Sequence, residues 1–456
     1  MKQLLTKNRM KKHFPFYLML IAWSFAFSST AANRYVSVGG SGNGLSWATA
    51  KGSIQSAIYD CSAGDTVFVS FGVYNEAFAI KDGVSVLGGY NASTGERDWQ
   101  RFETILDGFG LGQYLIVKYD TDCVNPTLIE GLTLQNAEHS NEGGGAYIRG
   151  NITLANSIIR NCKGSNGGGV LINGAGVVRN CVIELCSATS SGGGIRNKGG
   201  LVESCILRGN QGKYGTIRND GGTISNCIVH NNSATVSGWP NSGGIYNPGG
   251  VVVNCILACN YGSQYAAIHS NSTAINNVCW NNQAEDGFSD PVAFISSGGS
   301  SSGYNAAESG FDASCFVLTL NANNTALDGP NFKSPTTFVG IPGSDAEIAA
   351  MRAADFSFTS ASPCIDKGTA TLAPAKDFLG VTRPKGTAVD LGAYEYDPDA
   401  VPVAVTGVEL TVDTLRLEEE ETSWLSIIIT PTDATNKKVT WLSSNTIIAT
   451  VSNGLV

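Results

Sequence analysis

The chain has 456 residues, 55 of them glycine, with 42% hydrophobic and 15% charged side chains and a formal net charge of −9. The low charged fraction argues against a disordered polyelectrolyte, and glycine without a three-residue period argues against collagen. Five basic residues lie in an N-terminal segment that we expect to be removed, which takes the charge from −9 to −14. We therefore expect no nucleic-acid partner and no anionic membrane partner.

Residues 1–32 have the three parts of a secretory signal peptide. A basic stretch ends at His13, an apolar run covers Phe14 to Phe27, and a small-residue end follows from Ser29 to Ala32. The apolar run is shorter than the ~20 residues of a membrane-spanning helix, so an N-terminal anchor helix is the less favoured alternative. Because no later run is long enough either, we expect an exported protein without a transmembrane helix, extracellular or on the outer cell surface.

Residues 33–65 are expected to cap a larger domain. Ile54, Ala57 and Ile58 have the spacing of an amphipathic helix, and short strands broken by Gly and Asp follow from Thr66. A cap of this kind is needed where stacked coils would otherwise expose an apolar core and unpaired strand edges.

Six segments between Gly143 and Asn282 repeat one pattern of Gly-rich turns and short β-branched runs. A period near two dozen residues has no room for a crossover helix and fits a coil of three strands and three turns. Stacked coils place equivalent residues in one column at a spacing of roughly 4.8 Å. The sequence therefore predicts an all-β, single-stranded right-handed parallel β-helix. Equivalent positions are Ser157, Cys181, Cys205, Cys227, Cys255 and Val278.

The alignment of these coils predicts columns of one residue type. Two columns are apolar: Val178, Val202, Ile224 and Val252, and Ile183, Leu207, Val229 and Leu257. A third carries amides that can hydrogen-bond along the axis: Asn180, Asn226, Asn254 and Asn277, with Ser204 substituting once. The cysteine column is interpreted as small apolar core filler, with a redox or metal role as the alternative. Cys162 and Cys186 are the pair to test first for a disulfide.

Charged residues are few in the repeats and lie on separate coils. Between Gly143 and Asn282 the only acidic residues are Glu184, Glu203 and Asp220. One column contains Arg160, Glu184, Arg208 and His230, and is interpreted as a solvent-exposed ladder of charges. Another contains Arg196, Arg218, Tyr246 and His269, and Arg218 with Asp220 is expected to form a surface pair. These acids and the scattered histidines do not form a metal site, and we predict no catalytic residue and no cofactor.

The repeats resemble those of polymorphic outer-membrane and autotransporter-like β-helix proteins. The resemblance lies in the alternation of GGGI or GGI with Ile/Leu-x-x-Asn, as in Leu207-Arg208-Gly209-Asn210. Residues 34–90 look like the opening segment of secreted bacterial β-helix proteins. Residues 355–396, which end in GAYEY, resemble the segment called choice-of-anchor Q, which ends such helices in surface proteins. These resemblances imply that a pectate-lyase-like β-helix covers residues 66–397.

Residues 398–404 form a Pro- and Asp-containing linker, after which the sequence alternates between apolar and polar positions. Residues 405–456 resemble a bacterial Ig-like domain of group 2, through Val405-Thr406-Gly407-Val408, Ile429-Thr430-Pro431 and Val439-Thr440-Trp441. The resemblance implies a β-sandwich with Trp441 in its core. Because the chain stops at Val456, where two further strands are expected, we predict an incomplete sandwich, as a fragment or a truncated product.

Exposed aromatic side chains are the remaining candidates for binding. Sugar rings stack on such faces, although aromatic edges can also simply cover the exterior of the coils. The candidates are Tyr214, Trp239, Tyr246, Tyr261 and Tyr265.

The sequence therefore predicts a monomeric, non-catalytic surface protein for adhesion or glycan contact, whose partner is a polysaccharide or a host or neighbouring cell surface. The alternative is a pectate-lyase-like polysaccharide lyase or glycoside hydrolase. It would act through Asp107, Asp120, Asp122 and Glu130, with Ca²⁺ as a cofactor only in the lyase case.

Overall fold

The computed structural model describes residues 32–118, 121–140, 142–234, 242–285, 293–295, 303–307, 316–320 and 329–401. In the C-terminal part it describes residues 403–410, 414–417, 425, 427–431, 434, 439, 441, 443–445 and 448–451. Within these ranges, no helix combines the length and the apolar character needed to cross a membrane.

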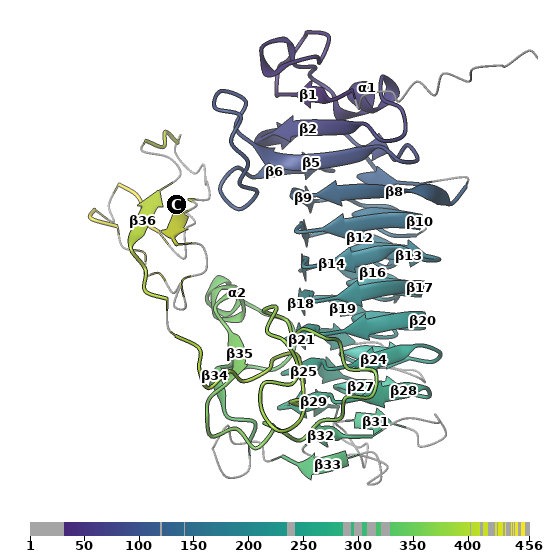
Figure 1. Ribbon diagram of the computed structural model, residues 1–456, viewed down its shortest axis with the longest axis vertical. Helices are drawn as coiled ribbons and strands as arrows, with labels where there is room; N and C mark the ends of the chain where they lie inside the picture. Colours follow the sequence, from purple (N-terminus) through teal and green to yellow (C-terminus); the bar gives the residue numbers. More distant parts are fainter. Residues whose placement is uncertain are drawn as a thin grey trace, which may run out of the picture. The chain divides into compact units, whose positions relative to one another are not determined.

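Stacked coils form three parallel sheets along one axis (Figure 1). The first sheet has the path β1 (Arg34–Val36), β2 (Thr66–Ser70), β5 (Ser85–Tyr90), β8 (Cys123–Glu130), β10 (Ala146–Ala155), β13 (Val170–Asn173), β17 (Ile195–Glu203), β20 (Ile217–Ser225), β23 (Ile245–Asn247), β27 (Ile268–Ser270) and β31 (Ala293–Ile295). Strands β4 (Phe78–Ala79), β7 (Ile116–Val117), β14 (Val177–Arg179), β24 (Val251–Val253) and β28 (Thr273–Ile275) also belong to it.

The second sheet contains β3 (Gly72–Tyr74), β6 (Thr104–Asp107), β9 (Leu132–Gln135), β11 (Ile158–Arg160), β15 (Val182–Glu184), β18 (Ile206–Arg208), β21 (Ile228–His230), β25 (Ile256–Ala258), β29 (Val278–Trp280), β32 (Asn305–Ala307) and β33 (Phe316–Thr319). The third sheet contains β12 (Lys163–Asn166), β16 (Ser187–Ser191), β19 (Gln211–Gly212), β22 (Ser233–Ala234), β26 (Tyr261–Gly262) and β30 (Gln283–Ala284). The predicted parallel β-helix is therefore confirmed.

The predicted apolar columns are confirmed by the register of the strands. Val178 pairs with Val202, Val202 with Ile224, and Ile224 with Val252, and all four are buried. The column that starts at Ile183 is equally regular and buried. Because each strand pairs with its equivalent on the next coil, side chains of one type stack along the whole interior.

The cysteine column lies in this interior, as predicted. Cys181, Cys205, Cys227 and Cys255 are buried, and each thiol lies near a backbone carbonyl of the preceding coil, as Cys205 Sγ does with Val178 O at 3.5 Å. All eleven cysteines that the structure describes are free thiols, including Cys162 and Cys186. Core packing rather than cross-linking therefore accounts for these cysteines.

The alignment is wrong by one residue at its last coil. Val278 pairs with Ile256, so that Asn277, not Val278, is equivalent to Cys255. The asparagine column continues instead through Asn276, which donates to Asn254 Oδ1 at 3.2 Å. Both Asn254 and Asn276 have positive φ angles, a backbone conformation that asparagine tolerates better than most residues. Two consecutive asparagines make the choice of column ambiguous in sequence.

Helix α1 (Ile54–Tyr59) lies beside β1 at the N-terminal end of the stack (Figure 1). The 3-10 helix η1 (Trp47–Thr49) and α1 lie between β1 and β2 in sequence, and α1 buries Ile54, Ala57 and Ile58. The Ser53 side chain accepts a hydrogen bond from the Ser56 backbone N–H at 3.3 Å, which caps the first turn of α1.

Residues 329–396, the flanking segment, pack against the outer face of the second sheet at β21, β25, β29 and β32 (Figure 1). The segment contains β34 (Phe332–Ser334), helix α2 (Asp345–Arg352) and β35 (Asp355–Phe358), with β34 and β35 antiparallel. Its aromatic side chains form a second apolar cluster with residues of β25 and β29, including Ile256 and Trp280.

This cover corrects the interpretation of one charged column. Arg160, Glu184, Arg208 and His230 stack in register as predicted. However, only 4% of the Glu184 side chain is exposed, and its carboxylate pairs with Arg208 and with Arg352 of α2 at 2.8 and 2.5 Å. His230 is buried against Phe356 of β35. The exposed-ladder interpretation is therefore wrong for Glu184 and His230, because the flanking segment packs on them.

Strands β36 (Gly407–Leu410) and β37 (Ile427–Thr430) form an antiparallel pair. Trp441 is partly buried in the residues that the structure describes, whereas the Ig-like resemblance implied a core position.

Candidate functional site

The outer face of the first sheet carries a column of large polar and aromatic side chains. Arg196, Arg218, Tyr246 and His269 pair in register on β17, β20, β23 and β27, which confirms the predicted column. Tyr214 lies in the turn before β20, and Tyr265 pairs with Ser242 in the equivalent turns of the next two coils. We call Arg196, Tyr214, Arg218, Asp220, Tyr246 and Tyr265 the arginine–tyrosine face.

Asp220 joins the two arginines of this face. Its Oδ1 accepts from Arg218 Nε at 2.6 Å, and its Oδ2 accepts from Arg196 Nε at 2.9 Å. The predicted Arg218–Asp220 pair is therefore confirmed. The three side chains are 20 to 26% exposed, so their charges are partly screened by solvent. Two guanidinium groups and one carboxylate leave the group with one net positive charge.

Two tyrosine rings lie near the Arg218 guanidinium. Its central carbon lies 5.8 Å from the Tyr214 ring centroid and 5.6 Å from that of Tyr246. Both distances allow a cation–π attraction, which orients the guanidinium plane. Burial raises the pKa of Tyr246, although the Arg218 charge opposes the shift, so the phenol stays protonated at neutral pH and can donate a hydrogen bond.

His269 continues the column as an uncharged ring. It lies 5.3 Å from Tyr246 and 4.6 Å from Tyr265 between ring centroids. Burial lowers the pKa of His269 to about 4, so the imidazole is neutral near pH 7. His269 therefore packs against Tyr246 and Tyr265 as a neutral ring.

The predicted binding residues do not all meet. Tyr214, Tyr246 and Tyr265 share the arginine–tyrosine face, whereas Tyr261 lies on β26 of the third sheet, near Gly340 of the flanking segment. Trp239 lies outside the described residues. The prediction did not include the two arginines and Asp220 among the binding residues, although their shared column was visible in the sequence.

The carboxylates of the enzyme alternative are engaged separately. Asp107 accepts from Gln135 and Asn136, Asp122 pairs with Arg149, and Glu130 pairs with Arg97 at 3.3 Å. Asp120 lies outside the described residues. Over the part of the chain that the structure describes, no three His, Cys, Asp or Glu side chains are grouped to hold a metal ion. Asp107, Asp122 and Glu130 therefore do not come together as a group that could bind calcium.

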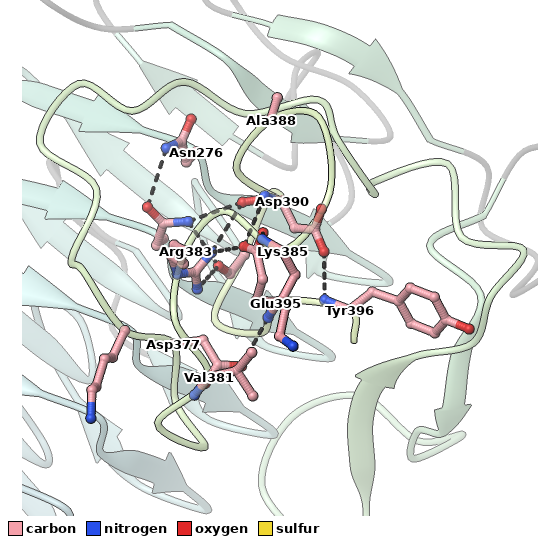
Figure 2. Close-up of polar contacts among 12 residues, drawn as sticks. Asn276, Asp377, Val381, Arg383, Lys385, Ala388, Asp390, Glu395 and Tyr396 are labelled. Carbon is pink, nitrogen blue, oxygen red and sulfur yellow. Dashed lines mark hydrogen bonds and ion pairs between the residues drawn. The ribbon is translucent and has the colours of Figure 1, made fainter. Parts of the chain in front are cut away.

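A second polar cluster lies where the flanking segment meets the coils (Figure 2). Arg383 donates to Glu395 at 3.1 Å, and the carboxylates of Asp377 and Asp390 each accept two or more backbone N–H groups. Burial raises the pKa of Asp390 to about 6, and it also raises the pKa of Asp377 and of Glu395. These groups are occupied by internal hydrogen bonds, so the cluster holds the segment in place.

Asparagines of the coils complete this junction. Asn226 donates to Lys376 O at 2.7 Å, Asn254 to Gly392 O at 3.0 Å, and Asn276 to Thr369 O at 2.7 Å. The asparagine column, with Asn276 in place of the predicted Asn277, therefore satisfies backbone carbonyls of the flanking segment.

Comparisons with known proteins support the two-part architecture. Residues 404–456 match the family model of the bacterial Ig-like domain (group 2). Among solved structures, the chain is similar to pectate lyase Pel9A, with 18% identity and a TM-score of 0.51 over 81% of this chain and 97% of that chain. The chain is a parallel β-helix, similar in fold to pectate lyase Pel9A, and its residues 404–456 match a bacterial Ig-like domain of group 2. At this identity, the likeness to Pel9A shows the fold alone.

A mutant of the PL6 family alginate lyase AlyGC also matches, with 12% identity and a TM-score of 0.25 over 82% of this chain and 60% of that chain. A TM-score that low carries no argument about this chain. No curated protein matches the chain in sequence.

Proposed function

We propose that this protein is an exported, non-catalytic β-helix protein that contacts polysaccharide at a cell surface through its arginine–tyrosine face. One observation carries the proposal: the Arg218 guanidinium lies within cation–π distance of both Tyr214 and Tyr246, which come from consecutive coils. Aromatic faces stack on sugar rings, and guanidinium and phenol groups donate to hydroxyl and carboxylate oxygens. Coils about 4.8 Å apart present such groups repeatedly along one direction, as a linear polymer requires.

The chemistry of the face favours binding over catalysis. Asp220 is committed to two arginines, and its shared hydrogen bonds compete with any role as a general base. His269 is buried between tyrosines with a lowered pKa. A lyase or hydrolase reaction remains the alternative that the experiment below tests directly.

The proposed organisation follows the sequence. Residues 1–32 are a cleaved signal peptide, 33–65 a cap, 66–397 the β-helix ending in a choice-of-anchor Q-like segment, 398–404 a linker and 405–456 the Ig-like domain. We propose that the protein acts as a monomer without a cofactor, and that its repeats belong with those of polymorphic outer-membrane proteins. The basic and apolar parts of residues 1–32 and the Ig-like module support export and surface display.

Binding of the purified protein to a panel of neutral and acidic polysaccharides tests the proposal. The double substitution Tyr214→Ala and Tyr246→Ala is expected to abolish binding, because both ring faces beside Arg218 are lost. Tyr59→Ala is the matched control, since Tyr59 is 72% exposed on α1 at the cap. Unaltered binding by the double variant, or the release of unsaturated uronates or reducing sugars from any polysaccharide, would overturn the proposal.

A further inference from the structure

Arg218 presents an unused edge of its guanidinium. Its Nε donates to Asp220, and among the residues that the structure describes its two Nη nitrogens have no hydrogen-bond acceptor. Arg196 differs, because its Nε binds the same carboxylate while its Nη1 donates to Asn166 Oδ1 at 2.8 Å. Of the two arginines on this face, Arg218 therefore has the free pair of parallel donors.

The free edge is held in a fixed orientation. Asp220 fixes the Nε side of the group, and the guanidinium carbon lies 5.8 Å from the Tyr214 ring centroid and 5.6 Å from that of Tyr246. A long flexible side chain normally loses rotamer freedom when it binds a ligand. Here that freedom is already restricted in the unbound protein, so less of it remains to be lost.

We propose that Arg218 is an oxyanion receptor: its two Nη nitrogens bind a carboxylate or sulfate group of an acidic polysaccharide. This inference rests on the proposed function and adds the chemical class of the glycan. The two parallel donors of a guanidinium match the two oxygens of a planar carboxylate, and they match two oxygens of a sulfate equally well. The net positive charge of the arginine–tyrosine face adds attraction for an anionic polymer, which weakens as salt is added.

Asp220 acts as a positioning residue, but its negative charge weakens the attraction of the arginine–tyrosine face for an anionic ligand. It orients Arg218, but its negative charge cancels half of the positive charge of the two arginines. Asp220→Asn keeps a side-chain oxygen that can accept from Arg218 Nε and removes the charge. This variant is therefore expected to bind an acidic polymer more tightly at low salt and to show a steeper salt dependence. A purely structural role of Asp220 would not steepen the salt dependence.

The test uses matched pairs of acidic and neutral polymers with the full protein. Polygalacturonate is compared with its methyl ester for the carboxylate, and dextran sulfate with dextran for the sulfate. Wild-type protein is expected to bind an acidic member of a pair at least about tenfold more tightly than its neutral partner. Which pair shows the difference identifies the oxyanion. Equal affinity for acid and neutral forms in both pairs overturns the inference without any substitution.

Variants locate the effect. Arg218→Lys keeps the charge and loses the two-donor edge, and is expected to weaken binding of the acidic polymer about tenfold. Arg179→Ala is the matched control, because Arg179 is an exposed arginine on β14 of the same sheet. Full affinity of Arg218→Lys would overturn the inference.

The two proposals fail in distinguishable ways. If the protein binds the neutral polymers through Tyr214 and Tyr246 and is indifferent to Arg218→Lys, the proposed function stands and the oxyanion receptor falls. If neither the acidic nor the neutral polymers bind, both proposals are overturned. Circular dichroism and thermal unfolding establish that each variant is folded before its affinity is interpreted.

Discussion

The Arg383 guanidinium lies 3.1 Å from the Glu395 carboxylate, and only 1% and 0% of the two side chains are exposed. Arg383 also donates to Gly392 O at 3.1 Å and to Asn226 Oδ1 at 3.3 Å, so that one side chain links two parts of the flanking segment to a coil of the β-helix. A buried ion pair is costly to break because its remaining charge stays in a medium of low polarity.

Removing this guanidinium should destabilise the protein. Arg383→Ala leaves Glu395 without its cation and Asn226 Oδ1 without its donor, so we expect the free energy of unfolding to fall by about 3–5 kcal/mol. Denaturant unfolding of wild type and variant measures the change. Lys385→Ala is the control, since Lys385 pairs with Asp397 at the surface and should leave the midpoint unchanged. Equal midpoints for Arg383→Ala and wild type would contradict the prediction.

The same cluster should give stability an unusual pH dependence. Burial raises the pKa of Asp390 to about 6, from 3.8 in an unfolded chain, so the folded state holds a proton that the unfolded state releases. Its contribution to stability is fully present below about pH 4 and is lost as pH rises through about 6. The raised pKa values of Asp377 and Glu395 act in the same direction.

Other carboxylates make the protein less stable as pH falls, which opposes the effect of Asp390. The prediction therefore concerns the difference in stability between wild type and a variant that lacks the Asp390 carboxylate. Burial disfavours the charge of Glu184, but Arg208 and Arg352 outweigh it and lower the pKa, so its contribution is lost as pH falls. We therefore compare wild type with Asp390→Asn in denaturant unfolding from pH 4 to 7.5. The stability advantage of wild type over the variant should shrink as pH rises. A constant or growing advantage would show that Asp390 does not hold the proton.

A second row of buried asparagines should be essential for stability, and it consists of Asn210, Asn232, Asn260 and Asn282. Asn232 Nδ2 donates to Leu207 O at 3.0 Å and to Asn260 Oδ1 at 2.9 Å, and its Oδ1 accepts from the Asn210 backbone N–H at 2.9 Å. Asn232→Ala leaves several buried polar groups without a hydrogen-bond partner, at about 1–3 kcal/mol each. We therefore expect the free energy of unfolding to fall by at least about 3 kcal/mol. Asn151→Ala, at an exposed asparagine with one described hydrogen bond, should unfold like wild type.

The cysteine columns predict a specific pattern of thiol reactivity. The eleven described cysteines are free and buried, so a thiol reagent should modify them only after the protein is unfolded. Adding a reductant should leave the thermal midpoint unchanged, because no bond among these residues contributes to it. A midpoint that falls on reduction, or more than one thiol that reacts in the native state, would contradict the packing interpretation, since of the cysteines Cys315 alone lies outside the described residues.

The sequence predicted the interior more fully than the surface. The column of Val178, Val202 and Ile224 could be found because stacked coils repeat a residue type at a constant interval. The same reasoning failed at Asn276 and Asn277, where two identical residues satisfy the pattern in either register. The repeat pattern identified the column that contains Arg218. It did not show that the two Nη nitrogens of Arg218 are unused, because that depends on three-dimensional contacts with Asp220, Tyr214 and Tyr246.

By itself, the sequence determined the coil period, the parallel register and the identity of the columns up to the last coil, because these follow from neighbours that are two dozen or so residues apart and chemically alike. Only the tertiary structure decided which columns face solvent. Glu184 is covered by Arg352, which lies 168 residues further along the chain, and Asn226 binds Arg383, which is 157 residues away. Contacts at that separation leave no periodic signal, since the flanking segment is not a repeat and packs on the coils once.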